Sequence, residues 1–112
     1  MEMRSYALDV LVKDPAILTD AEGLVSLLYQ AAEAGGATVL KGQHHVFPNG
    51  ALTAVLILAQ SHLSAHTWPE YQLMNIDLFV YGQVKGEQIL AELENQLAPL
   101  RTNLTCLVRA VP

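Results

Sequence analysis

The side chains best suited to chemistry lie together in the middle of the chain. One short segment carries a serine hydroxyl, two imidazoles, an indole and a carboxylate, on Ser61, His62, His66, Trp68 and Glu70. The segment follows a strongly apolar stretch and contains Pro69, so we expect residues 61–71 to form a loop that leaves the end of a strand. Such a loop is a common place for a catalytic site.

Residue types alone allow three interpretations of this segment. His62 and His66 could share a metal ion, but their spacing suits a helix, and Pro69 and the preceding strand argue against one. Ser61 with a histidine could form a hydrolase site, although the chain has no Gly-x-Ser-x-Gly elbow. Alternatively, the histidines are ordinary loop residues and Trp68 anchors the core. Spacing does not separate this last interpretation from catalysis, and we predict no metal site.

Composition narrows the class of partner. Hydrophobic residues make up 52% of the 112 residues and charged residues 15%, so the chain can bury a core, and the length predicts one domain over residues 1–112. The net charge of −5, with only 6 Lys and Arg, argues against nucleic acid and favours a small-molecule substrate. The single Cys106, the lack of a signal-like N-terminus and the lack of a long apolar run predict a cytoplasmic chain without a membrane partner. The apolar fraction is also high for so small a domain, so we expect part of its surface to be buried in a homo-oligomer.

Periodicity predicts the elements that hold this segment. A capping box at residues 19–22 begins a first helix, which ends at Gly35 and Gly36, and a second helix spans residues 86–97. Alternating apolar residues predict strands over residues 4–13, 38–45, 52–59, 74–80 and 103–111, the second and third joined as a hairpin by Pro48-Asn49-Gly50.

Strands outnumber helices in this order and adjoin one another in the middle of the chain. That arrangement favours an α+β fold, a two-layer sandwich in which two helices pack on one face of an antiparallel sheet. Cys106 falls on an alternating apolar face of the last strand and is expected in the core.

The central segment also resembles a known family. The run from Ser61 to Tyr71, continuing to Asp77, Phe79 and Gly82, is similar to the signature of the bacterial S-adenosylmethionine decarboxylase proenzymes. The Gly35-Gly36-Ala37-Thr38 stretch, the Phe47-Pro48 segment and the strand order fit the same family. The resemblance therefore covers essentially the whole chain.

The resemblance implies that the chain cuts its own backbone between Gln60 and Ser61. The Ser61 hydroxyl would attack the carbonyl of Gln60, and His66 would remove the serine α-proton, so that Ser61 becomes a covalent pyruvoyl cofactor. This ketone would form an imine with the substrate amine and accept the electrons released by decarboxylation. The implied reaction converts S-adenosylmethionine to its decarboxylated form for spermidine synthesis, in a homodimer with composite sites.

Other roles carry over residue by residue. Phe47 matches the aromatic residue that stacks on adenine, and Glu70 matches the carboxylate that holds the ribose hydroxyls. Without the resemblance, we would interpret them as a core phenylalanine and a solvated glutamate. Trp68 and Pro69 are interpreted as scaffold that aims Ser61 and His66.

Three positions depart from the family pattern. Gln60 replaces a glutamate before the cleaved bond, and Thr53 replaces the serine that assists processing but keeps a hydroxyl. Tyr81 replaces the cysteine that donates a proton to the substrate, and a phenol is bulkier and intrinsically less acidic than a thiol. Cys106 does not occupy the position of that cysteine.

These departures leave two alternatives open. Tyr81 could reshape the pocket for a basic amino acid, so that the enzyme decarboxylates arginine or ornithine. The three substitutions together could instead have abolished cleavage, leaving an unprocessed paralogue that acts as a binding or regulatory subunit.

Overall fold

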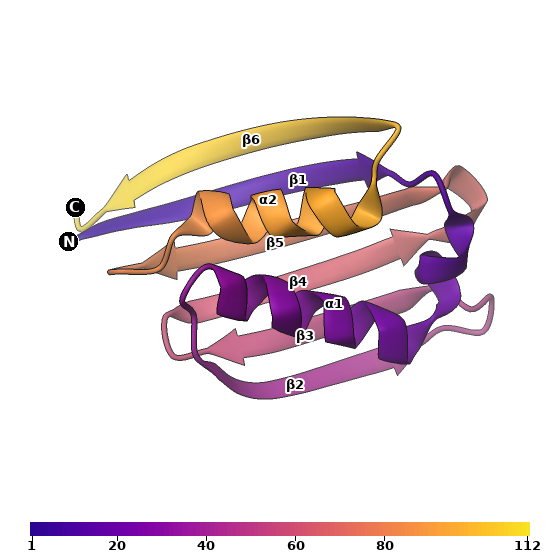
Figure 1. Cartoon of the computed structure of the whole chain (residues 1–112). Coiled ribbons are helices and arrows are strands. Elements are labelled where there is room, and N and C mark those ends of the chain that lie inside the picture. The colour runs from indigo at the N-terminus through magenta and orange to yellow at the C-terminus, as the bar shows by residue number, and fades with distance from the viewer.

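A computed structural model describes residues 1–112 and shows one six-stranded sheet with two helices on one face (Figure 1). The sheet order is β2-β3-β4-β5-β1-β6, and every neighbouring pair is antiparallel. The predicted α+β two-layer sandwich is confirmed. The strands are β1 (Glu2–Leu11), β2 (Val39–Val46), β3 (Leu52–Leu58), β4 (Ser61–Trp68), β5 (Leu73–Tyr81) and β6 (Arg101–Ala110). The helices are α1 (Ala21–Ala34) and α2 (Gly86–Leu97), with 3-10 turns at Pro15–Thr19 and Pro69–Tyr71.

Local sequence explains where α1 begins and ends. The N-cap is Asp20, one residue later than the predicted capping box implies, and its carboxylate accepts a hydrogen bond of 2.9 Å from the Gly23 amide. Gly36 follows the helix with φ of +82°, a left-handed conformation that glycine adopts without steric cost.

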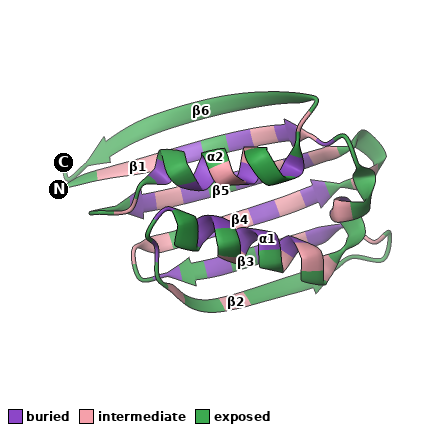
Figure 2. Cartoon of the chain, in the orientation of Figure 1, coloured by how far each residue is buried: buried purple, intermediate pink, exposed green.

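The core lies between the helices and the sheet. Alternate residues of β1, β3, β4 and β5 are buried there, among them Leu8, Leu56, Leu63 and Ile76, and they pack against the apolar stripes of both helices (Figure 2). No helix covers the other side of the sheet, which we call the open face (Figure 1). Side chains that alternate with the core residues therefore project from the open face.

The loop predicted for residues 61–71 is wrong, because Ser61–Trp68 is the strand β4, paired with β3 and β5. Its core-facing residues are Leu63, Ala65 and Thr67, two of which are small or polar and so hide the alternation in the sequence. Thr67 is fully buried, but its hydroxyl donates to the Leu18 carbonyl (2.7 Å) and accepts from the Leu52 amide (2.8 Å). A buried polar side chain satisfied in this way is compatible with a central strand.

The expectation that Cys106 is buried is also wrong. Cys106 lies on β6 and is exposed, as is every other residue of that strand (Figure 2). It pairs with Tyr6 on β1 and therefore lies on the helix side of the sheet. The helix α2 lies over β1 and β5 and leaves β6 uncovered (Figure 1).

Candidate active site

A row of polar residues crosses the open face of the sheet. The strand pairings align His45 with Thr53, Thr53 with His66, His66 with Asn75, and Asn75 with Asp9. The row begins on β2 and crosses β3, β4 and β5 to reach β1. Its alignment is set by backbone register, so the sheet itself holds these side chains next to one another.

Within this row, His66 contacts both a hydroxyl group and aromatic rings. Its Nδ1 lies 2.7 Å from the Thr53 hydroxyl, which fixes the ring orientation. Phe47 and Trp68 approach the imidazole edge-on, with ring centroids 5.6 Å and 4.5 Å away. The Thr53 hydroxyl and the His66 imidazole therefore form one hydrogen-bonded pair.

Phe47, His66, Trp68 and Glu70 line a cavity of about 450 Å³. The Glu70 carboxylate accepts a hydrogen bond of 3.3 Å from the side chain of Asn49, which also lines the cavity. The walls thus combine aromatic surfaces with an anionic acceptor. Such a cavity suits a flat heterocycle that carries hydroxyl donors.

Sequence reasoning missed the groups that hold this wall. The indole of Trp68 donates to the Asn75 side chain (2.6 Å), and Asn75 in turn donates to the Asp9 carboxylate (2.8 Å). Asn49 bridges the turn amide of Ala51 (3.1 Å) and Glu70. Strand register brings Asn75 and Asp9 beside the site, and this register is invisible in a single sequence.

Ser61 lies at the other end of β4, in the tight turn from β3. Its φ is +114°, although it is not glycine, and this conformation costs roughly 1–3 kcal/mol. The register aligns Ser61 with Leu58 and Val80, both buried, whereas its hydroxyl lies 3.0 Å from Nδ1 of His62. The strained residue therefore directly follows the peptide bond between Gln60 and Ser61.

Gln60 and Tyr81 flank this turn. The Gln60 side chain accepts a hydrogen bond from the Thr38 amide (3.2 Å), and the Tyr81 hydroxyl donates to the Ala59 carbonyl (3.4 Å). Tyr81 lies on the same side of β5 as Asn75 and Asp77, as its strand parity predicts, and is 41% exposed. The phenol therefore lies at the turn that holds Ser61.

The predicted site residues consequently form two groups at opposite ends of β4. Ser61 and His66 are five residues apart on one extended strand, which separates them by about 16 Å. Gln60 and Tyr81 accompany Ser61, whereas Thr53, Phe47 and Glu70 accompany His66. The loop expected to aim Ser61 and His66 is instead a strand, and within a single chain this strand holds the two residues apart.

Comparison with known proteins places the chain in a family. The family model described as S-adenosylmethionine decarboxylase matches residues 4–110. The chain belongs to the S-adenosylmethionine decarboxylase family. Among relatives with this activity in their names, a proenzyme of Brevibacillus brevis is 38% identical over 96 residues, covering 85% of this chain and 72% of that protein. A proenzyme of Methanococcus maripaludis is 36% identical over 95 residues, covering 84% of this chain and 78% of the relative.

A solved member of the S-adenosylmethionine decarboxylase family has the same fold. The adenosylmethionine decarboxylase from Aquifex aeolicus VF5 superposes with a TM-score of 0.86 and 25% sequence identity. The match covers 100% of this chain and 92% of that one. The six-stranded sheet with two helices is therefore shared across the full length of this chain.

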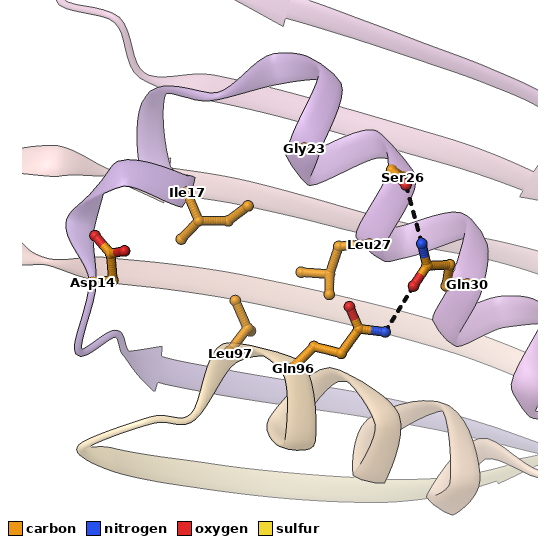
Figure 3. Close-up of a pocket in the computed structure, with 8 residues that line it drawn as sticks. All are labelled: Asp14, Ile17, Gly23, Ser26, Leu27, Gln30, Gln96 and Leu97. Atoms are coloured by element: carbon orange, nitrogen blue, oxygen red, sulfur yellow. Dashed lines mark hydrogen bonds between the residues drawn. The ribbon is translucent and has the colours of Figure 1, made fainter.

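A second cavity of this chain lies on the helix side of the sheet, between α1 and α2 (Figure 3). It measures about 270 Å³, with Ile17, Leu27 and Leu97 among its walls. Gln30 donates to Ser26 (3.2 Å) and accepts from Gln96 (2.9 Å), so these polar groups bind one another (Figure 3). It holds neither a histidine nor a cysteine, and the open face is the better candidate for the active site.

No group of three or more His, Cys, Asp or Glu side chains is arranged to hold a metal ion, and His62 and His66 are four residues apart on a strand, about 13 Å. Neither helix has the length and apolar character needed to cross a membrane.

The resolved pKa shifts lie where α2 meets β1. Burial and the hydrogen bond to Glu87 raise the pKa of Tyr6, whose hydroxyl lies 3.0 Å from that carboxylate. A backbone hydrogen bond, then the Tyr6 hydroxyl, lower the pKa of Glu87, and Arg4 lies 3.8 Å away. These groups anchor the start of α2 and are separate from the candidate site.

Proposed function

We propose that the chain is a self-processing decarboxylase that acts on S-adenosylmethionine, and that its cofactor is a pyruvoyl group made from Ser61. The observation that carries this proposal is the backbone of Ser61, a non-glycine residue with φ of +114° in a tight turn. Cleavage of the bond before Ser61 would release this strain. The family assignment supports the same reaction.

Processing uses groups of this chain. The Ser61 hydroxyl oxygen attacks the Gln60 carbonyl, the amide C–N bond breaks, and the acyl group moves from nitrogen to oxygen as an ester. An imidazole then removes the α-proton of Ser61, and β-elimination expels residues 1–60 with a C-terminal carboxylate. The dehydroalanine left behind takes up water and loses ammonia, which leaves a ketone at the new N-terminus. Two chains, 1–60 and 61–112, would result.

The imidazole that removes this proton comes from a second copy of the chain, because His66 of the same chain lies about 16 Å from Ser61. Two copies joined through their open faces by a two-fold axis would each bring the His66 end of β4 to the Ser61 end of the partner's β4. Val55, Ile57 and Tyr81 leave exposed apolar surface on that face, as a buried interface between copies requires. The site is then composite, and the functional unit is a homodimer.

The cavity supports S-adenosylmethionine as the substrate. Phe47 and Trp68 offer aromatic surfaces to an adenine ring, and the Glu70 carboxylate offers oxygen acceptors to ribose hydroxyls. The ketone, once formed, accepts the electron pair left by loss of carbon dioxide. The Tyr81 hydroxyl, at the Ser61 turn, supplies a proton to the product carbon directly or through water. The product, decarboxylated S-adenosylmethionine, serves spermidine synthesis.

The test combines a denaturing gel with release of labelled carbon dioxide. Wild-type protein should separate into two fragments, and Ser61→Ala should stay whole and release no carbon dioxide. Ser64→Ala is the matched control, because Ser64 lies on the same strand and should leave cleavage intact. Carboxyl-labelled S-adenosylmethionine, arginine and ornithine are compared, and preference for either amino acid would overturn the assigned substrate. An uncut wild-type chain would overturn the enzyme and favour a binding or regulatory paralogue.

A further inference from the structure

The sheet has two edge strands, and only one of them is protected against pairing with another strand. β2 carries Lys41, Gly42 and two histidines, and a bulge interrupts its pairing with β3 between Val39 and Lys41. Lysine, glycine and bulges at an edge are features that block edge-to-edge association. This edge of the sheet is closed to a further strand.

β6, at the opposite edge, has none of these features. Its pairing with β1 runs from Arg101 to Ala110 without a register shift, and it contains no lysine, acidic residue, glycine or proline. Every residue of β6 is exposed (Figure 2), including Leu104 (50%), Leu107 (58%) and Val108 (54%). A regular apolar edge of this length, with unpaired backbone groups along it, is a template for another strand.

We propose that β6 pairs antiparallel with β6 of a second copy, so that two sheets join into one continuous sheet. A two-fold axis at Cys106 places Cys106 opposite the same residue of the partner subunit. Leu104 then lies opposite Val108, and Asn103 lies opposite Arg109. The apolar residues on the helix side cover one another, and each Arg109 faces a neutral amide.

Neighbouring registers are less favourable. Centring the axis on Thr105 sets Arg101 opposite Arg109 at both ends of the interface, which is a like-charge pair. Centring it on Leu107 leaves Arg101, Thr102 and Asn103 without partners within β6. The Cys106 register keeps the longest apolar overlap without opposing charges.

This interface differs from the open-face contact of the proposed active site. The edge lies in the plane of the sheet, so both contacts can form at once, and a dimer with composite sites would become a tetramer. Edge pairing involves no residue assigned to catalysis, and its failure leaves the proposed function standing.

The first test measures native mass by light scattering after size exclusion. Cys106→Lys sets two lysines face to face on the axis and should halve the native mass, with self-cleavage unchanged. Leu40→Lys, on the protected edge strand β2, is the matched control and should leave the native mass unchanged. A mass unaltered by Cys106→Lys overturns the proposal.

The second test measures register and does not depend on disrupting the edge. In a Cys106→Ser background, Leu104→Cys and Val108→Cys proteins are oxidised with diamide, separately and as a mixture. The mixture should cross-link about tenfold faster, because residues 104 and 108 lie within disulfide reach while like residues lie about 13 Å apart. Equal rates in all three samples would overturn the register and, with it, the pairing.

Discussion

The strongest consequence of the geometry is that two defective chains should repair each other. Ser61→Ala removes the nucleophile and His66→Ala removes the base, so neither variant should cleave alone. In a mixed dimer, however, Ser61 of the His66→Ala chain meets His66 of the Ser61→Ala chain. One of the two composite sites is then complete.

The size of the effect follows from two-fold symmetry. Random assortment of equal amounts makes about half of all dimers mixed, and each mixed dimer cleaves one of its two chains, so about one quarter of all chains should be cut. The cut chain is always the His66→Ala chain, because only that chain has Ser61. An affinity tag on one variant identifies it.

The assay is a denaturing gel of co-expressed variants, with each variant expressed alone as the control. The separation of about 16 Å along β4 leaves no route for Ser61 and His66 of one chain to react. No cleavage in the mixture would refute the composite site, and cleavage of His66→Ala alone would refute His66 as the base.

Three further predictions concern single side chains. Thr53→Val removes the hydroxyl 2.7 Å from His66 and should slow self-cleavage by about tenfold, whereas Thr53→Ser should restore it, as measured by a time course on gels. Glu70→Gln should raise KM for S-adenosylmethionine by about tenfold to a hundredfold with little change in kcat, because the charged acceptor is lost; an unchanged KM would contradict the ribose role. Glu87 has a lowered pKa, so its contribution to stability is present above its ordinary pKa of 4.5 and is lost as the pH falls through the lowered pKa. Urea unfolding should show Glu87→Gln less stable than wild type at pH 7, and the difference should shrink steadily as the pH falls below 4.5; a difference that does not change with pH would contradict the linkage.

Periodicity was sufficient to predict the layers of this fold. The helices around Leu27 and Ile89 and the strand around Leu78 each present a continuous apolar face, and their order allows few packings. β4 was missed because its buried positions include Ala65 and Thr67, and Thr67 is buried only because it bonds to Leu18 and Leu52. Those partners come from tertiary structure.

The site shows a similar division. The sequence motif identifies Ser61 and His66 as candidates, but it does not show how far apart they lie. A loop could bring the two residues together, whereas the strand β4 holds them near its opposite ends. Asn75 and Asp9 support the Trp68 wall through strand register, and Asp9 is far from Trp68 in sequence. Cys106 was expected in the core because alternation shows which side chains share a face and not whether a helix covers that face.

The central claim is that Ser61 changes chemically, and the intact mass of the fragment 61–112 tests it most directly. We expect this fragment to be lighter than the unmodified peptide by about 17 Da, since the serine exchanges its amine for a ketone and releases ammonia. Treatment with a hydrazine should shift its mass further. A fragment that begins with an unmodified serine, or a whole chain of residues 1–112, would contradict the account.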